Sequence, residues 1–257
     1  MFDLHTVVQL FAVAVAGGFV GLDRTAAGQF MVSQPIVAGP LAGWLLGDAT
    51  TGMIIGGVLE LIWVLDIPVG TFVPADATIG AVSATAIAVL SSRGAAPLDL
   101  IGFCLLLTTA TVPITMMVDE FVRRRNSGLA DAALAGPFEE PACRLSRAHL
   151  SGLIVFFLKS FVVYLFFIPA GLAAVALFWH LPERVHAGMT LFVKVLPLLG
   201  AALMLHKLSI VVLDRFFIAG FAGSVGLGVL LHGHPLILIL LVILAGFAGA
   251  RFSERRS

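Results

Sequence analysis

Long uncharged stretches alternate with short polar ones along the chain. Notable stretches without Lys, Arg, Asp or Glu are Leu4–Leu22, Thr25–Gly47, Leu100–Val118 and Ser160–Pro182. Roughly 20 apolar residues suffice for a helix to cross the hydrocarbon core of a bilayer. The pattern therefore predicts an all-α polytopic membrane protein with about 8–10 transmembrane or re-entrant helical segments.

The apolar runs of the N-terminal part are shorter and more interrupted than the others. Runs at 33–47, 51–66 and 74–92 are rich in glycine and punctuated by prolines. Irregular backbone at membrane depth is tolerated only inside protein or beside a wet cavity, because each unsatisfied amide in lipid costs several kcal/mol. Helices broken by Gly and Pro therefore indicate a substrate path, and some of these runs are expected to re-enter rather than cross.

Charged residues gather in two places, and these divide the chain. The chain has 15 basic and 15 acidic residues; ten of these 30 lie in 119–148, and four more lie in 251–257. Lys and Arg concentrate in the cytoplasmic loops of membrane proteins, so both segments are expected to be cytoplasmic. The predicted parts are an N-terminal membrane half (1–118), a cytoplasmic charged loop (119–148), a C-terminal membrane half (149–250) and a cytoplasmic tail (251–257).

An even number of crossings must separate the two cytoplasmic segments. Four are found in the C-terminal half, at about 149–180, 187–206, 216–231 and 235–250. The first of them contains Pro169, so it is expected to be kinked, tilted or divided into two pieces.

Composition excludes several classes of function. The chain is 60% hydrophobic and 12% charged, with a mean hydropathy of +1.07, whereas soluble domains carry about 25% charged residues. A soluble enzyme is excluded, and the zero net charge gives no basic surplus for nucleic acid. The two cysteines, Cys104 and Cys143, predict neither a disulfide framework nor a metal cluster. No catalytic or phosphate-binding motif occurs, so we expect no catalytic residue, metal or cofactor.

Four of the seven carboxylates of the N-terminal half cluster within 29 residues of apolar sequence, where ionisable groups cost about 2.5–3.5 kcal/mol to insert. They are Asp48, Glu60, Asp66 and Asp76, with no Lys or Arg between the first and the last. Such carboxylates without partners suit the hydroxyls of a neutral sugar, proton or cation coupling, or merely helix ends facing water. Asp48 is expected to cap a helix beginning at about Thr51, whereas Glu60 and Asp76 are expected to be functional.

Glycines recur every four residues in the same region. The two series are Gly39, Gly43, Gly47 and Gly52, Gly56. Small residues at this spacing form one helical stripe along which helices approach closely in lipid. Glu60 continues the second series, which predicts that its carboxylate lies on the packed face of its helix rather than toward lipid.

The segment from about residue 20 to residue 90 resembles the IIC component of the mannose/fructose/sorbose family of the sugar phosphotransferase system (PTS). The matching residues are Gly21-Leu22-Asp23, Gln34-Pro35-Ile36-Val37, Leu46-Gly47-Asp48, the run Gly52 to Glu60, Gly70 and Ala75-Asp76-Ala77. The resemblance implies a sugar permease of the bacterial inner membrane, with a hexose-class substrate. It also implies a IID membrane subunit, an oligomeric complex in the lipid bilayer, and soluble IIA and IIB proteins that carry the phosphoryl group.

By matching position, the resemblance implies sugar contact for Glu60, Asp76 and Gln34. It implies structural or gating roles for four glycines, namely Gly52, Gly56, Gly57 and Gly70. The chain itself would then be a transport subunit and no enzyme.

The sequence also departs from the family pattern. Where the family often has Asn-Ile-Gly followed by Pro-Asp-Ala, this chain has Pro68-Val69-Gly70 and Ala75-Asp76-Ala77. The loss of an amide that could bond sugar hydroxyls indicates either a substrate other than mannose or a weakened transport role. Two alternatives therefore stay open: an ion-coupled secondary transporter, and a divergent, non-transporting membrane sensor or scaffold.

Overall fold

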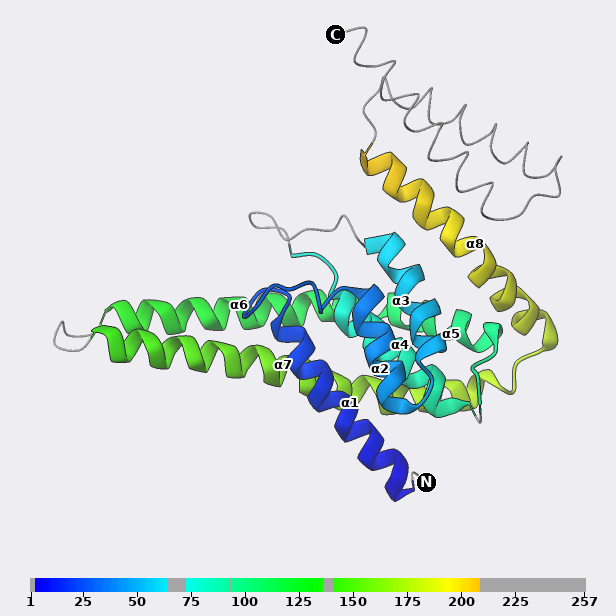
Figure 1. The fold of residues 1–257 in the computed structure, drawn as a ribbon, viewed down its shortest axis with the longest axis horizontal. Helices are drawn as coiled ribbons and strands as arrows, with labels where there is room; N and C mark the ends of the chain where they lie inside the picture. The colour runs from blue at the N-terminus through cyan, green and yellow to red at the C-terminus, as the bar shows by residue number, and fades with distance from the viewer. Residues whose placement is uncertain (1–2, 64–72, 93, 136–140, 209–257) are drawn as a thin grey trace, which may run out of the picture. The chain divides into compact units, whose positions relative to one another are not determined.

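The computed structural model describes residues 3–63, 73–92, 94–135 and 141–208, which form eight α-helices and no strand (Figure 1). The helices are α1 (Leu4–Leu22), α2 (Pro35–Leu46), α3 (Ala49–Trp63), α4 (Ala77–Ser91), α5 (Leu98–Ala110), α6 (Val112–Leu134), α7 (Pro141–Phe178) and α8 (Glu183–Leu208). The predicted all-α fold class is confirmed for this part of the chain. One compact unit covers Met1–Met204 and a second covers Leu205–Ser257, and the first unit is described below.

Three of the described helices are long and apolar enough to cross a membrane: α1, α7 and α8. Helices α5 and α6 form a fourth candidate if the pair, bent by 43°, counts as one span. Helices α2, α3 and α4 are apolar but short, with 12, 15 and 15 residues, as the interrupted runs predicted. The last two predicted crossings, 216–231 and 235–250, and the tail 251–257 lie outside the described residues.

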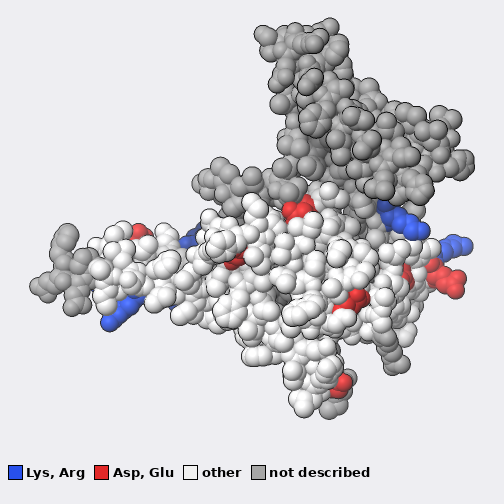
Figure 2. All heavy atoms as spheres, viewed as in Figure 1, with Lys and Arg blue, Asp and Glu red and all other residues white. Residues whose placement is uncertain are grey.

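The surface of the long helices suits a lipid environment. Large apolar side chains recur every four residues along α7 and are exposed: Leu150, Ile154, Leu158, Val162 and Phe166. Figure 2 shows few charged side chains and broad uncharged surface between them. Contiguous apolar surface of this extent is rare on soluble monomers and marks contact with membrane or partner protein.

Helices α2 and α3 form a tight antiparallel hairpin along their glycines. A Cβ atom added at Gly39 would lie 2.5 Å from the carbonyl oxygen of Gly52, and one added at Gly52 would collide with the backbone of Gly39. The close approach predicted from the glycine spacing is thus present. Gly47, which was expected to continue the stripe, instead ends α2 in the left-handed conformation with φ of 93°, which glycine adopts without a Cβ penalty.

Asp48 caps α3 as the sequence predicted, although the helix begins at Ala49 rather than at about Thr51. Its carboxylate accepts hydrogen bonds from the main-chain N–H of Thr51 at 3.0 Å and from the Thr51 hydroxyl. Replacing Asp48 with Ala should lower stability by about 1 kcal/mol, seen as a lower melting temperature of the purified protein in detergent. Asp48→Asn keeps a capping oxygen and is the control; an equal loss in both variants would contradict the capping role.

Helix α4 lies at the centre of the unit, and helices from both predicted halves pack around it. Every residue from 78 to 88 is buried, because small side chains let neighbouring helices approach closely. On α1, Gly17 and Gly18 leave room for the rings of Tyr164 and Phe157 of α7. The predicted boundaries of the four parts are not tested by this packing and stay predictions.

The charged segment 119–148 is helical in its described residues, not the loop that its composition predicted. Helix α6 continues to Leu134 and α7 begins at Pro141. Helix α7 then runs through Pro169 as one helix of 38 residues, so the predicted division of 149–180 into two pieces does not occur. The cytoplasmic placement of this helical hairpin stays a prediction.

Candidate functional site

Glu60 lies in the last turn of α3 and reaches the N-terminus of α2. Its Oε2 atom accepts a hydrogen bond from the main-chain N–H of Ile36 at 3.2 Å. The first N–H groups of a helix lack partners inside the helix and carry partial positive charge, so a carboxylate is stabilised there. This is the one hydrogen bond of Glu60 within the described residues, and the side chain is partly exposed. Its second carboxylate oxygen, Oε1, has no hydrogen-bond partner among the described residues.

Gln34 occupies the N-cap position of the same helix, and its side chain makes no capping hydrogen bond. Because Glu60 contacts Ile36, the structure brings Gln34 and Glu60 to one helix end. The approach is possible because Gly56, one turn before Glu60, packs directly on the carbonyl of Pro35. An amide and a carboxylate at one helix end together offer hydrogen-bond donors and acceptors to a polar ligand.

The loop that leads into α2 is held by Asp23. The Asp23 carboxylate accepts hydrogen bonds from the N–H groups of Phe30 at 2.6 Å and Ser33 at 3.0 Å. The hydroxyl of Thr78, on α4, donates to the Ser33 carbonyl at 2.7 Å. Burial raises the pKa of Asp23, but the hydrogen bonds from Ser33 and Phe30 outweigh burial and hold the pKa below its ordinary value. The residue before Gln34 is thus fixed from two directions.

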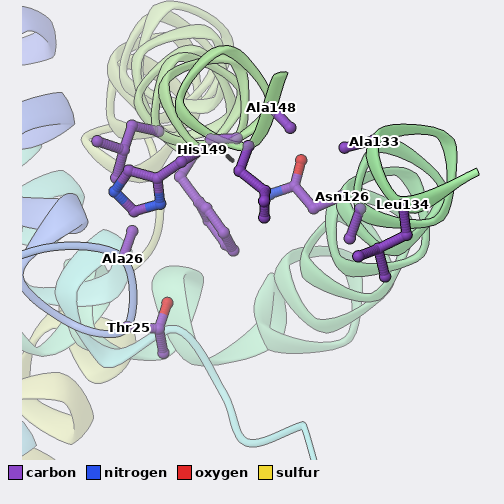
Figure 3. A pocket seen from close by; sticks show the side chains of 12 residues that line it. Thr25, Ala26, Asn126, Ala133, Leu134, Ala148 and His149 are labelled. Atoms are coloured by element: carbon purple, nitrogen blue, oxygen red, sulfur yellow. Dashed lines mark hydrogen bonds between the residues drawn. The ribbon is translucent and has the colours of Figure 1, made fainter. Parts of the chain in front are cut away.

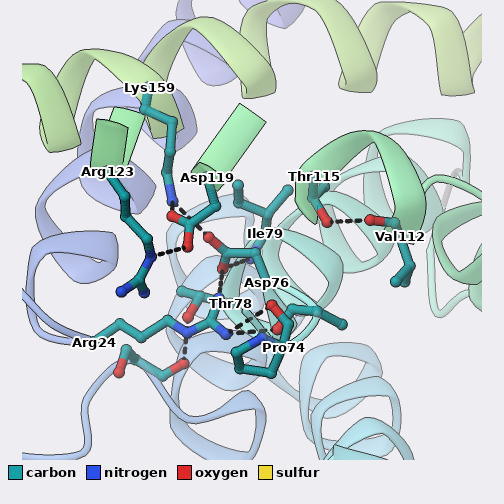
Figure 4. Close-up of polar contacts among 12 residues, drawn as sticks. Arg24, Pro74, Asp76, Thr78, Ile79, Val112, Thr115, Asp119, Arg123 and Lys159 are labelled. Atoms are coloured by element: carbon teal, nitrogen blue, oxygen red, sulfur yellow. Dashed lines mark hydrogen bonds and ion pairs between the residues drawn. The ribbon is translucent and has the colours of Figure 1, made fainter. Parts of the chain in front are cut away.

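Asp76, the second predicted carboxylate, is buried and has protein partners on both oxygens (Figure 4). Its Oδ1 accepts a hydrogen bond from the N–H of Ile79 at 3.2 Å, which caps α4, and lies 3.1 Å from Nη1 of Arg24. Its Oδ2 accepts from Nζ of Lys159 at 2.7 Å. The expectation that this carboxylate lacks a basic partner is therefore wrong, because one partner lies upstream on the chain and the other on α7.

Lys159 joins Asp76 to a further buried carboxylate. Its Nζ donates to Oδ1 of Asp119, on α6, at 3.0 Å. The other oxygen of Asp119 accepts from Nε of Arg123 at 2.8 Å. Sequence reasoning missed this network, but a signal existed: Lys159 is the one Lys, Arg, Asp or Glu between residues 148 and 183. An isolated base in a spanning run requires a partner.

Arg24 completes the network from the end of α1. Its guanidinium donates to the carbonyl oxygens of Pro74 at 3.3 Å and Ala75 at 2.7 Å. These contacts satisfy main-chain acceptors in the extended segment before α4, where no helical partner exists. Arg24 therefore holds both the main chain just before Asp76 and the Asp76 carboxylate.

The four predicted glycines differ in their surroundings. Gly52 and Gly56 pack against the α2 backbone, whereas a Cβ atom added at Gly57 would meet no other described element within 4 Å. Gly70 lies outside the described residues. Packing thus gives two of the glycines a structural role, and gating stays a prediction.

A separate pocket of about 420 Å³ lies between α6, α7 and the loop after α1 (Figure 3). Its lining is mostly apolar, with polar side chains from Thr25, Asn126 and His149. None of the predicted site residues lines it. Among the described residues, no group of three His, Cys, Asp or Glu is placed to hold a metal ion.

The sequence matches the family described as "PTS system sorbose-specific IIC component" over residues 7–247. The chain belongs to this family. IIC components are the transport subunits of PTS sugar uptake systems, and the family together with the membrane-spanning helices places this IIC chain in the bacterial inner membrane.

Several relatives of this IIC chain bear sugar names. One is a protein of Escherichia coli strain K12 with the provisional name N-acetylgalactosamine permease IIC component 2, 37% identical over 84 residues. That match covers 33% of this chain and 62% of the relative, so the chain spans less than two thirds of it. The Bacillus subtilis fructose permease IIC component is 25% identical over 86% of this chain and 78% of its own length. The mannose-specific EIIC component of E. coli K12 is 25% identical over 88% of this chain and 85% of its own length.

Two of the solved structures that resemble this chain illustrate the shared fold. A structure described only as a membrane protein has a TM-score of 0.74 at 20% identity, covering 100% of this chain and 98% of the other. A cryo-electron microscopy structure of the mannose transporter ManYZ with microcin E492 has a TM-score of 0.56 at 21% identity, covering 100% and 97%. At these identities the likeness concerns the fold of the IIC chain.

Proposed function

We propose that this IIC chain binds a hexose-class sugar where α3 meets the N-terminus of α2, and carries it across the membrane. The observation that supports this proposal is the Glu60 carboxylate beside Gln34. One of its oxygens has no hydrogen-bond partner among the described residues, and the helix end is held through Ser33 by Asp23 and Thr78. Carboxylates accept and amides both donate and accept hydrogen bonds, which suits the hydroxyls of a neutral sugar. Relatives named for fructose, mannose and sorbose support the hexose class.

The chain works with partners that supply the chemistry. A IID membrane subunit joins it in an oligomeric complex, and soluble IIA and IIB proteins carry the phosphoryl group to the sugar. Family membership supports this division of labour. Phosphorylation adds negative charge to the product, so a site built for a neutral ligand no longer binds it, and uptake becomes one-way.

The charged segment 119–148 and the tail 251–257 face the cytoplasm. Arginines support this orientation, because basic residues near membrane segments concentrate on the cytoplasmic side. They are Arg123, Arg124, Arg125, Arg144 and Arg147 in the hairpin, and Arg251, Arg255 and Arg256 in the tail. The phosphorylating partners would then approach the molecule from this side.

Sugar binding by the detergent-purified chain tests the proposal. Labelled hexoses, amino sugars and ketoses are titrated with and without a candidate IID partner, and saturable binding of one sugar is expected. In vesicles, uptake should require IIA and IIB and should resist an uncoupler. Uptake without the soluble proteins that an uncoupler abolishes would indicate ion coupling. Absence of binding by every sugar, even with the partner present, would overturn the proposal in favour of a sensor or scaffold.

A further inference from the structure

We propose that Lys159 is a positioning residue for the sugar site and that it acts through Asp76. The inference rests on the proposed function, because the site that is positioned is the helix end with Glu60 and Gln34. Sequence reasoning gave Asp76 a direct sugar contact. However, the Asp76 side chain is 4% exposed, and both of its oxygens bind protein donors within the described residues. Its place is behind the site.

A continuous series of contacts connects Lys159 with the sugar site, and Figure 4 shows the part of it around Lys159, Asp76 and Thr78. Lys159 holds Asp76 at 2.7 Å, and Asp76 caps α4. In the first turn of α4, the Thr78 hydroxyl binds the carbonyl of Ser33 at 2.7 Å. Ser33 immediately precedes Gln34. A displacement of the start of α4 therefore shifts the start of α2, where the sugar would bind.

The position of Lys159 is itself fixed by contacts of α7 with α6 and α1. Its Nζ also binds Asp119 of α6, and α7 packs closely on α1 through Tyr164 and Gly17. The lysine ammonium is a compact charge with three donors, so one group can bind carboxylates from two helices. Lys159 thereby links α4 to the α6–α7 hairpin.

Each carboxylate retains another cation when Lys159 is removed. Asp76 keeps Arg24 at 3.1 Å, and Asp119 keeps Arg123 at 2.8 Å. A buried ion pair that loses one partner leaves an uncompensated charge and destabilises the fold strongly. Here neither acid is left alone, so substitution of Lys159 cuts the link between the two helices while the fold persists.

A double-mutant cycle on sugar affinity tests the proposal. Lys159→Met keeps the length of the side chain without its charge, and should weaken binding of the sugar identified above at least tenfold. Lys159→Arg, which restores the charge, should stay within threefold of the wild type. Asp76→Asn alone should also weaken binding at least tenfold, and adding Lys159→Met should weaken it no further than threefold, because residues that act as one unit are non-additive.

Two outcomes of the cycle would overturn the proposal. Losses that multiply in the double variant would mean that Asp76 contacts the sugar independently of Lys159. Wild-type affinity in Lys159→Met would mean that the link does not position the site. Size-exclusion profiles of all variants show that equal amounts of folded protein are compared.

A second measurement needs no sugar and so separates this proposal from the proposed function. Ala75 is 8% exposed, and the Ala75→Cys variant, in a Cys143→Ser background, should react slowly with a maleimide. Lys159→Met should raise this rate at least tenfold, because the start of α4 is no longer held. Equal rates would overturn the positioning role. If the wild type binds no sugar but the rate rises, only the proposed function fails.

Discussion

Replacing Glu60 with Gln is expected to weaken sugar binding at least tenfold, or about 1.4 kcal/mol. The amide keeps the shape of the side chain but loses the negative charge that the N-terminus of α2 stabilises. It also replaces one carboxylate oxygen with an N–H₂ group, so one acceptor for a sugar hydroxyl is lost. Hydrogen bonds to an ionised acceptor are roughly twice as strong as those between neutral groups. Equilibrium binding of the labelled sugar to the purified variant measures the loss.

Glu120→Gln is the matched control for this prediction. Glu120 carries the same side chain on α6, where it is exposed and pairs with Arg124. Exposed pairs of this kind contribute little to stability, so the control should bind sugar as the wild type does. If a folded Glu60→Gln protein bound the sugar with wild-type affinity, Glu60 would not be part of the sugar site.

Replacing Gly56 with Ala is expected to remove most of the folded protein from the membrane. The added Cβ atom would collide with the carbonyl oxygen of Pro35, which is backbone and cannot turn aside. Overpacking of a dense core costs about 1–3 kcal/mol, and here the strain falls on the hairpin that presents Glu60. Any protein that still folds should bind sugar weakly, because α2 must move away from α3. Detergent extraction followed by size-exclusion chromatography and thermal melting measures the change.

Gly57→Ala provides the comparison, because it adds the same methyl group one residue further along α3. Apart from the surrounding turns of α3 itself, no atom of the described residues lies within 4 Å of the added Cβ, and alanine favours the helix more than glycine does by about 1 kcal/mol. This variant should be extracted and melt like the wild type or slightly better. If both alanine variants were equally abundant and stable, the close packing of α2 on α3 would be wrong.

Hydropathy alone located most of the helices. Helix α1 spans the first uncharged run, which Asp3 and Asp23 bound. Asp3 caps the N-terminus of the helix by accepting the main-chain N–H of Thr6. The short apolar runs at 33–47, 51–66 and 74–92 correspond to α2, α3 and α4. Glycine spacing also predicted that Glu60 lies near a packed helix face, since a four-residue period fixes one side of a helix.

Features that depend on pairing between distant residues were not predicted. The charged residues of 119–148 suggested a loop, but Asp119 with Arg123 and Glu120 with Arg124 form pairs four residues apart, which stabilise a helix. The partner of Asp76 on α7 lies 83 residues away, and no local pattern specifies such a pair. Sequence could therefore propose Asp76 as important, but not what it does.

The order of the buried charges along the chain has a consequence for biogenesis. The ribosome delivers Asp76 and Asp119 before Lys159, so both acids are already part of the chain when their shared base is made. A lysine at the centre of a spanning helix costs about 2.5–3.5 kcal/mol to insert, and waiting carboxylates offset that penalty. We therefore expect translocon-mediated integration of α7 to be more efficient when the earlier helices are already present, so that insertion of this protein is cooperative rather than a series of independent events.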